Sequence, residues 1–436
     1  MKMSNFQIIV TGLFALFLIV GVGVFAAFGG LLGGGGTGPV VIWGTVDNTT
    51  MSNLLATLRS SNKAFADVSY VQKKPATYDS DLLNAMAAGR GPDLFLVSQD
   101  EVYSFQNKIT PIPYGAVSQA QFINSFIDEG QLFLTPSGAL ALPFSVDPLV
   151  MYWNRDMYAT AGIASAPVYW NDFLTIAPKI TSLDASSNVR QAAVALGTWQ
   201  NVDNAKAILS TLFMQAGDSI AAQNASGDTV SVFGATPANA PTNPAESALR
   251  FYTEFADPSK TSYSWNSSLA QSSDAFTEGN VATYFGFASE YAAIAARNPN
   301  LSFGVSVLPQ LQGNSTRITF GNITGVALSR TASNPNGALA VAEGLTSQQA
   351  ISLLAAAVPL PPVRRDVSVD TSSNAAMAVF VESSLIAHAW LDPSPAQTDT
   401  IFQNMIEQVL SGATAPAGAV AEGSQALTQL FSGQTQ

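Results

Sequence analysis

The 436-residue chain contains no cysteine and a single histidine, His388. The lack of cysteine excludes disulfides, thiol catalysis, iron–sulfur clusters and cysteine-ligated zinc. It also excludes a lipid anchor attached through a cysteine. Charged residues are scarce too, at 11% of the chain, against about 25% in ordinary soluble domains. Because 47% of the residues are hydrophobic, the chain is nevertheless too apolar to be disordered.

Positively charged residues are scarcer than negatively charged ones. The 18 lysines and arginines face 30 aspartates and glutamates, which gives a net charge of −12. Nucleic-acid binding needs clustered basic residues to neutralise phosphates, so a nucleic-acid partner is not expected. The glycine run at residues 33–36 lacks the Lys-Ser/Thr of a phosphate-binding loop. We expect no cofactor and no metal, and the length suggests two or three domains of about 150 residues each.

An uncharged apolar run occupies residues 8–32. As a helix it would be about 37 Å long, enough to cross a hydrocarbon core of about 30 Å. A cleaved secretory signal is the competing interpretation, because Val24-Phe25-Ala26 loosely resembles a cleavage site. Signal peptides have a shorter apolar region of about 7–15 residues. The sequence therefore favours one uncleaved N-terminal transmembrane helix.

The few charges near this run predict its orientation. Lys2 precedes it, and the first positive residue after it is Arg59. The positive-inside rule then keeps the N-terminus in the cytoplasm. A glycine-rich stretch follows the run and is typical of a flexible tether. We expect residues 1–38 to be a single-pass anchor and tether in the cell membrane, with the remaining chain extracytoplasmic.

Strand and helix patterns alternate at the start of the body. The three predicted strands and two predicted helices lie at residues 40–43, 51–58, 68–71, 82–86 and 93–97. This order indicates a parallel sheet covered by helices. Ligands of such sheets bind beyond the carboxyl ends of the strands, which are here residues 44–47 and 98–100. Farther along, residues 192–198 suggest another apolar strand, and residues 222–244 a surface insertion or long loop.

A stretch at residues 140–156, LALPFSVDPLVMYWNRD, carries a family resemblance. It is similar to the entry strand of the maltose-binding-like extracellular solute-binding proteins (family 1), the substrate-binding proteins of ABC transporters. Phe144 and Arg155 stand where Tyr and Lys are common in that family. The family's next motifs follow in order as Ala161-Gly162-Ile163, Pro167 and Trp170-Asn171-Asp172-Phe173. Weaker matches continue at residues 275–282, 303–309, 320–327, 360–364 and 410–420.

The resemblance covers about residues 40–430 and implies an α/β fold. Such a fold is a two-lobed clamshell of the type II periplasmic-binding-protein kind, in which the lobes close on a ligand about a hinge. We expect hinge crossings near Asp147 and residues 321–325. Lobe 1 would comprise residues 39–147 plus about 325–365. Lobe 2 would comprise residues 148–324 plus about 366–436.

The resemblance also implies a binding function and no enzymatic activity. The protein would capture a small solute, most commonly a sugar or oligosaccharide, and present it to the permease subunits of an ABC importer. An anchored extracellular glycoside hydrolase or esterase is one alternative, and a surface binding or adhesion protein without a transporter is another. A hydrolase would need facing carboxylates or a catalytic triad, but there is no Gly-x-Ser-x-Gly motif. His388, in an apolar stretch, fits a structural role.

A cleft for a neutral polar solute needs aromatic faces with a few polar groups between them. The candidate ligand-binding residues are Thr45, Asp47, Gln99, Asp100, Asp147, Tyr152, Trp199, Phe287, Asn322 and Trp390. For some a structural role competes. Asp47 fits a helix cap better than a ligand contact, and Trp199 and Trp390 could instead pack in the core. The family carries Gly-x-Trp at Gly286, but this chain lacks the tryptophan, for which Phe287 or Tyr291 could substitute. Asp147 lies where the family carries a hinge carboxylate.

Overall fold

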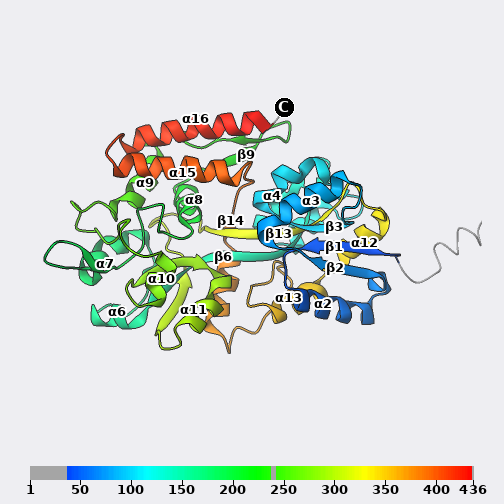
Figure 1. Cartoon of the computed structure of the whole chain (residues 1–436), viewed down its shortest axis with the longest axis horizontal. Coiled ribbons are helices and arrows are strands. Elements are labelled where there is room, and N and C mark those ends of the chain that lie inside the picture. The colour runs from blue at the N-terminus through cyan, green and yellow to red at the C-terminus, as the bar shows by residue number, and fades with distance from the viewer. Residues whose placement is uncertain (1–36, 237–241, 435–436) are drawn as a thin grey trace, which may run out of the picture.

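The structure is a computed structural model, and it describes residues 37–236 and 242–434. Figure 1 shows two groups of helices and strands at the two ends of an elongated molecule. Two long strands, β6 (Leu142–Asn154) and β13 (Thr319–Leu328), run from one group into the other. The structure is therefore a two-lobed α/β fold, as the sequence predicts. The group that contains the N-terminal strands is called the first lobe below, and the other the second lobe.

The first lobe is built on three parallel strands. Strand β1 (Val40–Gly44) lies between β2 (Val68–Gln72) and β3 (Leu94–Ser98), which confirms the predicted parallel sheet. The helices of this lobe are α2 (Asn48–Ser61), α3 (Tyr78–Ala87), α4 (Gln99–Phe105), α5 (Gln119–Ser125), α12 (Pro335–Leu345) and α13 (Gln348–Ala357).

Helix α2 shows how the sequence fixes these elements. The Asp47 side chain accepts a hydrogen bond of 3.0 Å from the Thr50 amide and so satisfies a free donor of the first turn. The helix then buries an apolar stripe against the sheet, at the spacing of one helical face. The stripe consists of Met51, Leu54, Leu55 and Leu58.

Strands β6 and β13 cross between the lobes as an antiparallel pair. Asp147 lies opposite Asn322, and Pro148 opposite Gly321. The C-terminal half of β13 pairs with β3 in the first lobe. The C-terminal half of β6 pairs with β11 (Thr283–Phe287) and β12 (Phe303–Val307) in the second. The two strands thus join the lobes where the sequence predicts the hinge.

The second lobe packs helices around β11, β12 and the end of β6. Its helices are α6 (Arg155–Thr160), α7 (Phe173–Ile180), α8 (Ala205–Gln215), α9 (Pro244–Glu254), α10 (Ser272–Thr277), α11 (Tyr291–Arg297), α14 (Ala375–Ser384), α15 (Pro395–Leu410) and α16 (Pro416–Gln434). Helices α15 and α16 lie side by side along one edge of the molecule (Figure 1). Both helices also pack against α9.

One local prediction differs from the structure, and the segment predicted as a surface insertion or long loop contains a short hairpin. Residues 192–198 do not form the predicted strand; they carry an isolated bridge from Ala192 to Val281. Gly197 has φ +105°, a backbone conformation that breaks a strand. Within the predicted loop at 222–244, part of the chain forms the hairpin of β9 (Ala221–Gln223) and β10 (Thr229–Ser231).

The membrane prediction concerns a different part of the chain. Across the described ranges, the structure contains no helix that is both long and apolar enough to cross a bilayer. The predicted anchor at residues 8–32 lies outside those ranges.

Candidate functional site

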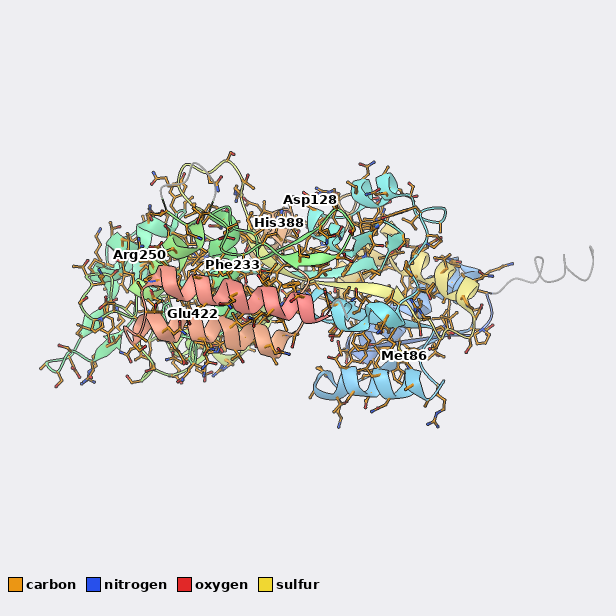
Figure 2. The ribbon with its side chains drawn as sticks, turned by 90° about the horizontal axis from the view of Figure 1, so that it is seen from above. Met86, Asp128, Phe233, Arg250, His388 and Glu422 are labelled. Carbon is orange, nitrogen blue, oxygen red and sulfur yellow. The ribbon has the colours of Figure 1, made fainter. Side chains whose placement is uncertain are left out.

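A cavity of about 550 Å³ lies between the two lobes. The first lobe contributes the 3-10 segment η4 (Asp128–Phe133), and the second lobe contributes the β9–β10 hairpin. Residues 388–391 complete the wall. They begin with the last residue of strand β14 (Ala387–His388), which pairs with the crossing strand β13. Figure 2 shows Asp128 and His388 close together where the lobes meet.

A second cavity of about 600 Å³ lies within the second lobe, between α9 and the turn that joins α15 to α16. It is slightly larger, but one lobe alone supplies its walls. Closure of the lobes would leave it unchanged, whereas closure would directly enclose a solute in the inter-lobe cavity. The inter-lobe cavity is therefore the candidate site.

Glu129 is the most unusual residue of this cavity. The residue lines the cavity but is only 2% exposed, and its two carboxyl oxygens are buried. Neither carboxyl oxygen has a hydrogen-bond partner within the described part of the chain. Burial raises the pKa of Glu129 to about 8, and repulsion from Asp100 and Asp147 adds to the shift. The carboxyl group packs against Gly321 of β13, where a Cβ would overlap it.

Asp100 and Asp147 approach Glu129 from two other elements. Asp100 lies in the first turn of α4, and burial together with repulsion from Asp392 raises its pKa to about 6. Asp147 lies on β6 and accepts a hydrogen bond of 3.0 Å from the Ser289 amide. Burial raises the pKa of Asp147 to about 6, although that hydrogen bond opposes the shift. The inter-lobe region thus gathers three carboxyl groups that burial makes harder to ionise.

A paired charge network lies beside the same cavity. Lys206 on α8 places its Nζ 2.6 Å from the Asp392 carboxylate and 2.9 Å from that of Asp399. The Lys206 ammonium also donates to the Thr398 hydroxyl at 2.7 Å and lies 5.6 Å from the centre of the Trp390 ring. Burial alone would lower the pKa of Lys206, but the two carboxylates outweigh it and raise that pKa.

Gln99 and Asn322 join the first lobe to the crossing strands. The Gln99 amide is fully buried and donates to the Asn322 side chain at 3.0 Å. Its oxygen accepts from the Ile323 amide at 2.8 Å. The two predicted site residues are thus brought together, and they fasten α4 to β13 at the hinge.

The remaining predicted residues lie in several places. Trp390 is buried, contributes to the cavity wall and stacks on Phe402 with ring centres 6.4 Å apart. Tyr152 is fully buried in the second lobe, where its hydroxyl donates to the Phe287 carbonyl at 2.7 Å. The Phe287 ring is half-buried and lies 6.5 Å from that of Phe320.

Three further predicted residues are, like most of the others, not part of the cavity wall. Thr45 and Asp47 are exposed after β1, where Asp47 caps α2. Trp199 is half-buried in the second lobe. Its neighbour Thr198 belongs to the wall of the other cavity. Of the ten predicted residues, the described wall of the inter-lobe cavity contains Trp390.

Glu129, Lys206 and Asp392 are not among the residues that the sequence predicts for the site. No motif marks Glu129, because its role comes from a contact with a strand far along the chain. The sequence Asp392-Pro393-Ser394 is typical of a turn. In the structure, the Asp392 carboxylate accepts a hydrogen bond of 2.9 Å from the Ser394 amide. The turn pattern says nothing about Lys206, which lies 186 residues away.

Comparisons with known proteins agree with this geometry. The family described as "Bacterial extracellular solute-binding protein" matches residues 48–351. No curated protein matches the chain in sequence. Among solved structures, a cyclo/maltodextrin-binding protein complexed with maltotetraose is 16% identical with a TM-score of 0.72, covering 90% of this chain and 96% of that chain.

Two further solved structures are similar in fold. The cyclic alpha-maltosyl-1,6-maltose binding protein from Arthrobacter globiformis is 17% identical with a TM-score of 0.73, over 91% of this chain and 100% of that one. UgpB from Mycobacterium tuberculosis, in complex with glycerophosphocholine, is 15% identical with a TM-score of 0.69, over 92% of this chain and 100% of that one. At these identities the likeness establishes the shared fold.

Proposed function

The chain belongs to the family of bacterial extracellular solute-binding proteins, and on that basis we propose that it captures a sugar or oligosaccharide for an ABC importer. The observation that carries the proposal is the polar cavity between the lobes. Its volume of about 550 Å³ is within the range of about 300–1,000 Å³ that is usual for small-molecule sites.

The lining of the cavity suits a polyhydroxyl solute. Gln119, Gln131 and Gln223 line it from both lobes, together with Thr229. Amide groups both donate and accept hydrogen bonds, which matches the hydroxyl groups of a sugar. Trp390 adds an aromatic group to this polar lining.

The mechanism that we propose is closure about the crossing strands. The solute would first contact the wall of one lobe, and rotation about β6 and β13 would bring the other wall against it. Closure needs differential binding, because a ligand shifts an equilibrium only by its preference for one state. Residues from both lobes that contact one solute would supply that preference.

We also propose that the body is extracytoplasmic and tethered by the N-terminal segment. The family is extracellular by description, and the apolar run at residues 8–32 supports an anchor. Tethering would keep the binding protein near the permease subunits of the importer, which raises the effective concentration of the loaded protein there.

A calorimetric screen of the full-length chain against mono- and oligosaccharides tests the solute class. We expect at least one sugar to bind with a measurable heat and to raise the melting temperature. Small-angle scattering with that sugar should show a smaller radius of gyration, because the lobes close. A response to another chemical class alone, with silence across sugars, would refute the sugar assignment.

The carboxyl groups near the hinge also motivate a check of the glycoside hydrolase alternative. A hydrolase uses two carboxyl groups that flank the scissile bond. Incubation with chromogenic glycosides distinguishes the functions: a binding protein releases no chromophore, whereas steady release that is lost in the Glu129→Gln variant would favour the hydrolase.

A further inference from the structure

The β9–β10 hairpin reaches from the second lobe to the first. The Gln223 side chain donates a hydrogen bond of 3.0 Å to the Leu134 carbonyl in strand β4 (Leu134–Thr135) of the first lobe. At the tip of the hairpin, a Cβ on Gly227 would lie 2.8 Å from the Cγ of Pro136, in the turn that follows β4. The hairpin therefore touches the first lobe through both its strand β9 and its turn.

The turn of the hairpin is braced from within. The Asn224 side chain accepts hydrogen bonds of 2.9 Å from the amides of Ser226 and Asp228. The Gly227 amide donates to the Asn224 carbonyl at 2.9 Å, and the φ of Gly227 is +86°, a conformation that glycine adopts without steric cost. These bonds fix the place at which the turn meets Pro136.

The base of the hairpin is fixed to the second lobe. Strand β10 packs against α16, and the Ser424 hydroxyl of that helix donates to the Phe233 carbonyl at 2.6 Å, just after the hairpin. A Cβ on the next residue, Gly234, would contact Ser424 and Val420. Figure 2 shows Phe233 beside this helix. We therefore expect the hairpin to move with the second lobe.

The C-terminal end of α16 makes another contact between the lobes. The Phe431 ring meets the Tyr103 ring of α4 edge to face, with ring centres 6.1 Å apart, and both side chains are buried. Figure 1 shows this end of α16 reaching toward α4. Burial raises the pKa of Tyr103, and repulsion from Asp228 of the hairpin adds to the shift. The hairpin and the helix end thus approach the first lobe together.

These contacts border the inter-lobe cavity. Ala221, Ala222, Gln223 and Thr229 line it from the hairpin, and Leu134 lines it from the first lobe. The hydrogen bond from Gln223 to Leu134 therefore joins opposite walls of the cavity. A rotation about β6 and β13 that separates these walls must break it, so the bond belongs to the closed arrangement of the lobes.

We propose that the β9–β10 hairpin and the C-terminal end of α16 (residues 221–231 and 424–434) form a strap that holds the lobes closed over the inter-lobe cavity, with or without a solute. The proposal deepens the proposed function and rests on it only in taking this cavity as the solute site. A solute then enters when the strap releases, and the strap contacts set the fraction of molecules that are open to it.

Distances between two spin labels test the strap in the full-length chain without any solute. Because the sequence contains no cysteine, labels attach only to introduced thiols. Asn53→Cys on α2 and Ala159→Cys on α6 place one label at an exposed position of each lobe. Pulsed electron paramagnetic resonance then measures the populations of the closed and open arrangements. With the strap intact, we expect one main distance.

Gln223→Ala should increase the ratio of open to closed molecules by about threefold to tenfold, because one hydrogen bond between the lobes is lost. Gln191→Ala is the matched control. Gln191, on β8 (Val189–Gln191), donates the same kind of bond at 2.8 Å to the Ile180 carbonyl, but both residues lie in the second lobe. The control should leave the two populations unchanged.

Gly227→Ala should open the lobes in the same way, because the added methyl would overlap the Pro136 ring. Gly217→Ala is its control. The φ of Gly217 is +89°, close to that of Gly227, and a Cβ there would meet no described atom within 4 Å. The two variants share the backbone strain of alanine at positive φ, so their difference reports the contact between the lobes. Melting curves check that every variant folds.

The outcomes separate the strap from the proposed function. Strap variants that open more than their controls support the strap. Equal populations in strap and control variants overturn it, and so does an unaltered strap in a protein whose lobes are already mostly open. None of these measurements needs a solute. Failure of every sugar to bind in the calorimetric screen would contradict the sugar assignment and leave the strap in place.

Discussion

Two buried carboxyl groups beside the same cavity have opposite surroundings. Asp392 accepts hydrogen bonds from the Lys206 ammonium at 2.6 Å, the Thr398 hydroxyl at 2.6 Å and the Ser394 amide at 2.9 Å. Glu129 accepts none within the described chain. The same functional group is thus fully hydrogen-bonded in the second lobe and without a partner among the described residues in the first.

The difference separates a buried carboxylate that the fold pairs from one that it leaves unpaired. A buried charge that is fully paired holds its neighbours in place, and removal of one partner is costly. A buried carboxyl without a partner lowers stability, so its presence points to a role outside folding. The predictions below test whether Asp392 contributes to stability and Glu129 opposes it.

Asp392→Ala should have the largest effect on stability. Lys206 would keep its charge in a mostly buried position and lose its closest partner. Breaking a buried pair on one side costs about 3–5 kcal/mol. Urea unfolding measures this free energy. Replacing both partners, as Lys206→Met with Asp392→Leu, should recover most of the loss, and a single variant as stable as the wild type would contradict the structural role.

The pH dependence of stability should reveal Glu129. Its pKa of about 8 in the folded state lies above its ordinary value of 4.5. Between pH 4.5 and pH 8, the folded state therefore binds more protons than the unfolded state. The free energy of unfolding should therefore fall as pH rises from about 4.5 to 8, by at most about 1.4 kcal/mol per pH unit for this group. Asp100 and Asp147, both raised to about 6, act in the same direction.

Glu129→Gln isolates the contribution of this one residue. Urea midpoints at pH 5, 6, 7 and 8 should decline less steeply in the variant, and the variant should be the more stable protein at pH 8. Curves that run parallel for the two proteins would show that Glu129 ionises freely in the folded state.

Gly321→Ala tests the contact between Glu129 and β13. The added methyl would overlap the Glu129 carboxyl, which must move toward the cavity. We expect a loss of about 1–2 kcal/mol, within the usual range for overpacking. In a Glu129→Ala background the same substitution should cost much less, because the obstructing group is gone. Additive effects in this double-mutant cycle would contradict the contact.

The sequence predicts the first lobe better than the cavity. The strands and helices of residues 40–98 follow from local apolar patterns and the Asp47 cap, and the structure confirms them. The family motifs around residues 140–156 identify the two-lobed fold. These signals are local, because each involves residues within a few turns of one another.

The cavity depends on contacts that no local pattern contains. Gln99 bonds to Asn322 across 223 residues, and Lys206 to Asp392 across 186. Gln99 and Asn322 could be proposed because both lie at strand ends or crossings. Glu129 could not, since only folding brings it against Gly321 and leaves its carboxyl without a partner in the described chain.

Thr398→Val should have the smallest effect on stability. It tests how much the Thr398 hydroxyl contributes to the hydrogen bonding of the Asp392 carboxylate. Valine has nearly the same shape but lacks the hydroxyl that bonds both Asp392 and Lys206. Because Lys206 still pairs with Asp392 directly, we expect a loss of only about 1 kcal/mol. Thr400→Val on the same helix is the control, since the exposed Thr400 hydroxyl bonds only a backbone carbonyl among its described contacts. If Thr398→Val were as damaging as Asp392→Ala, the hydroxyl rather than the ammonium would be the main group that stabilises the buried carboxylate.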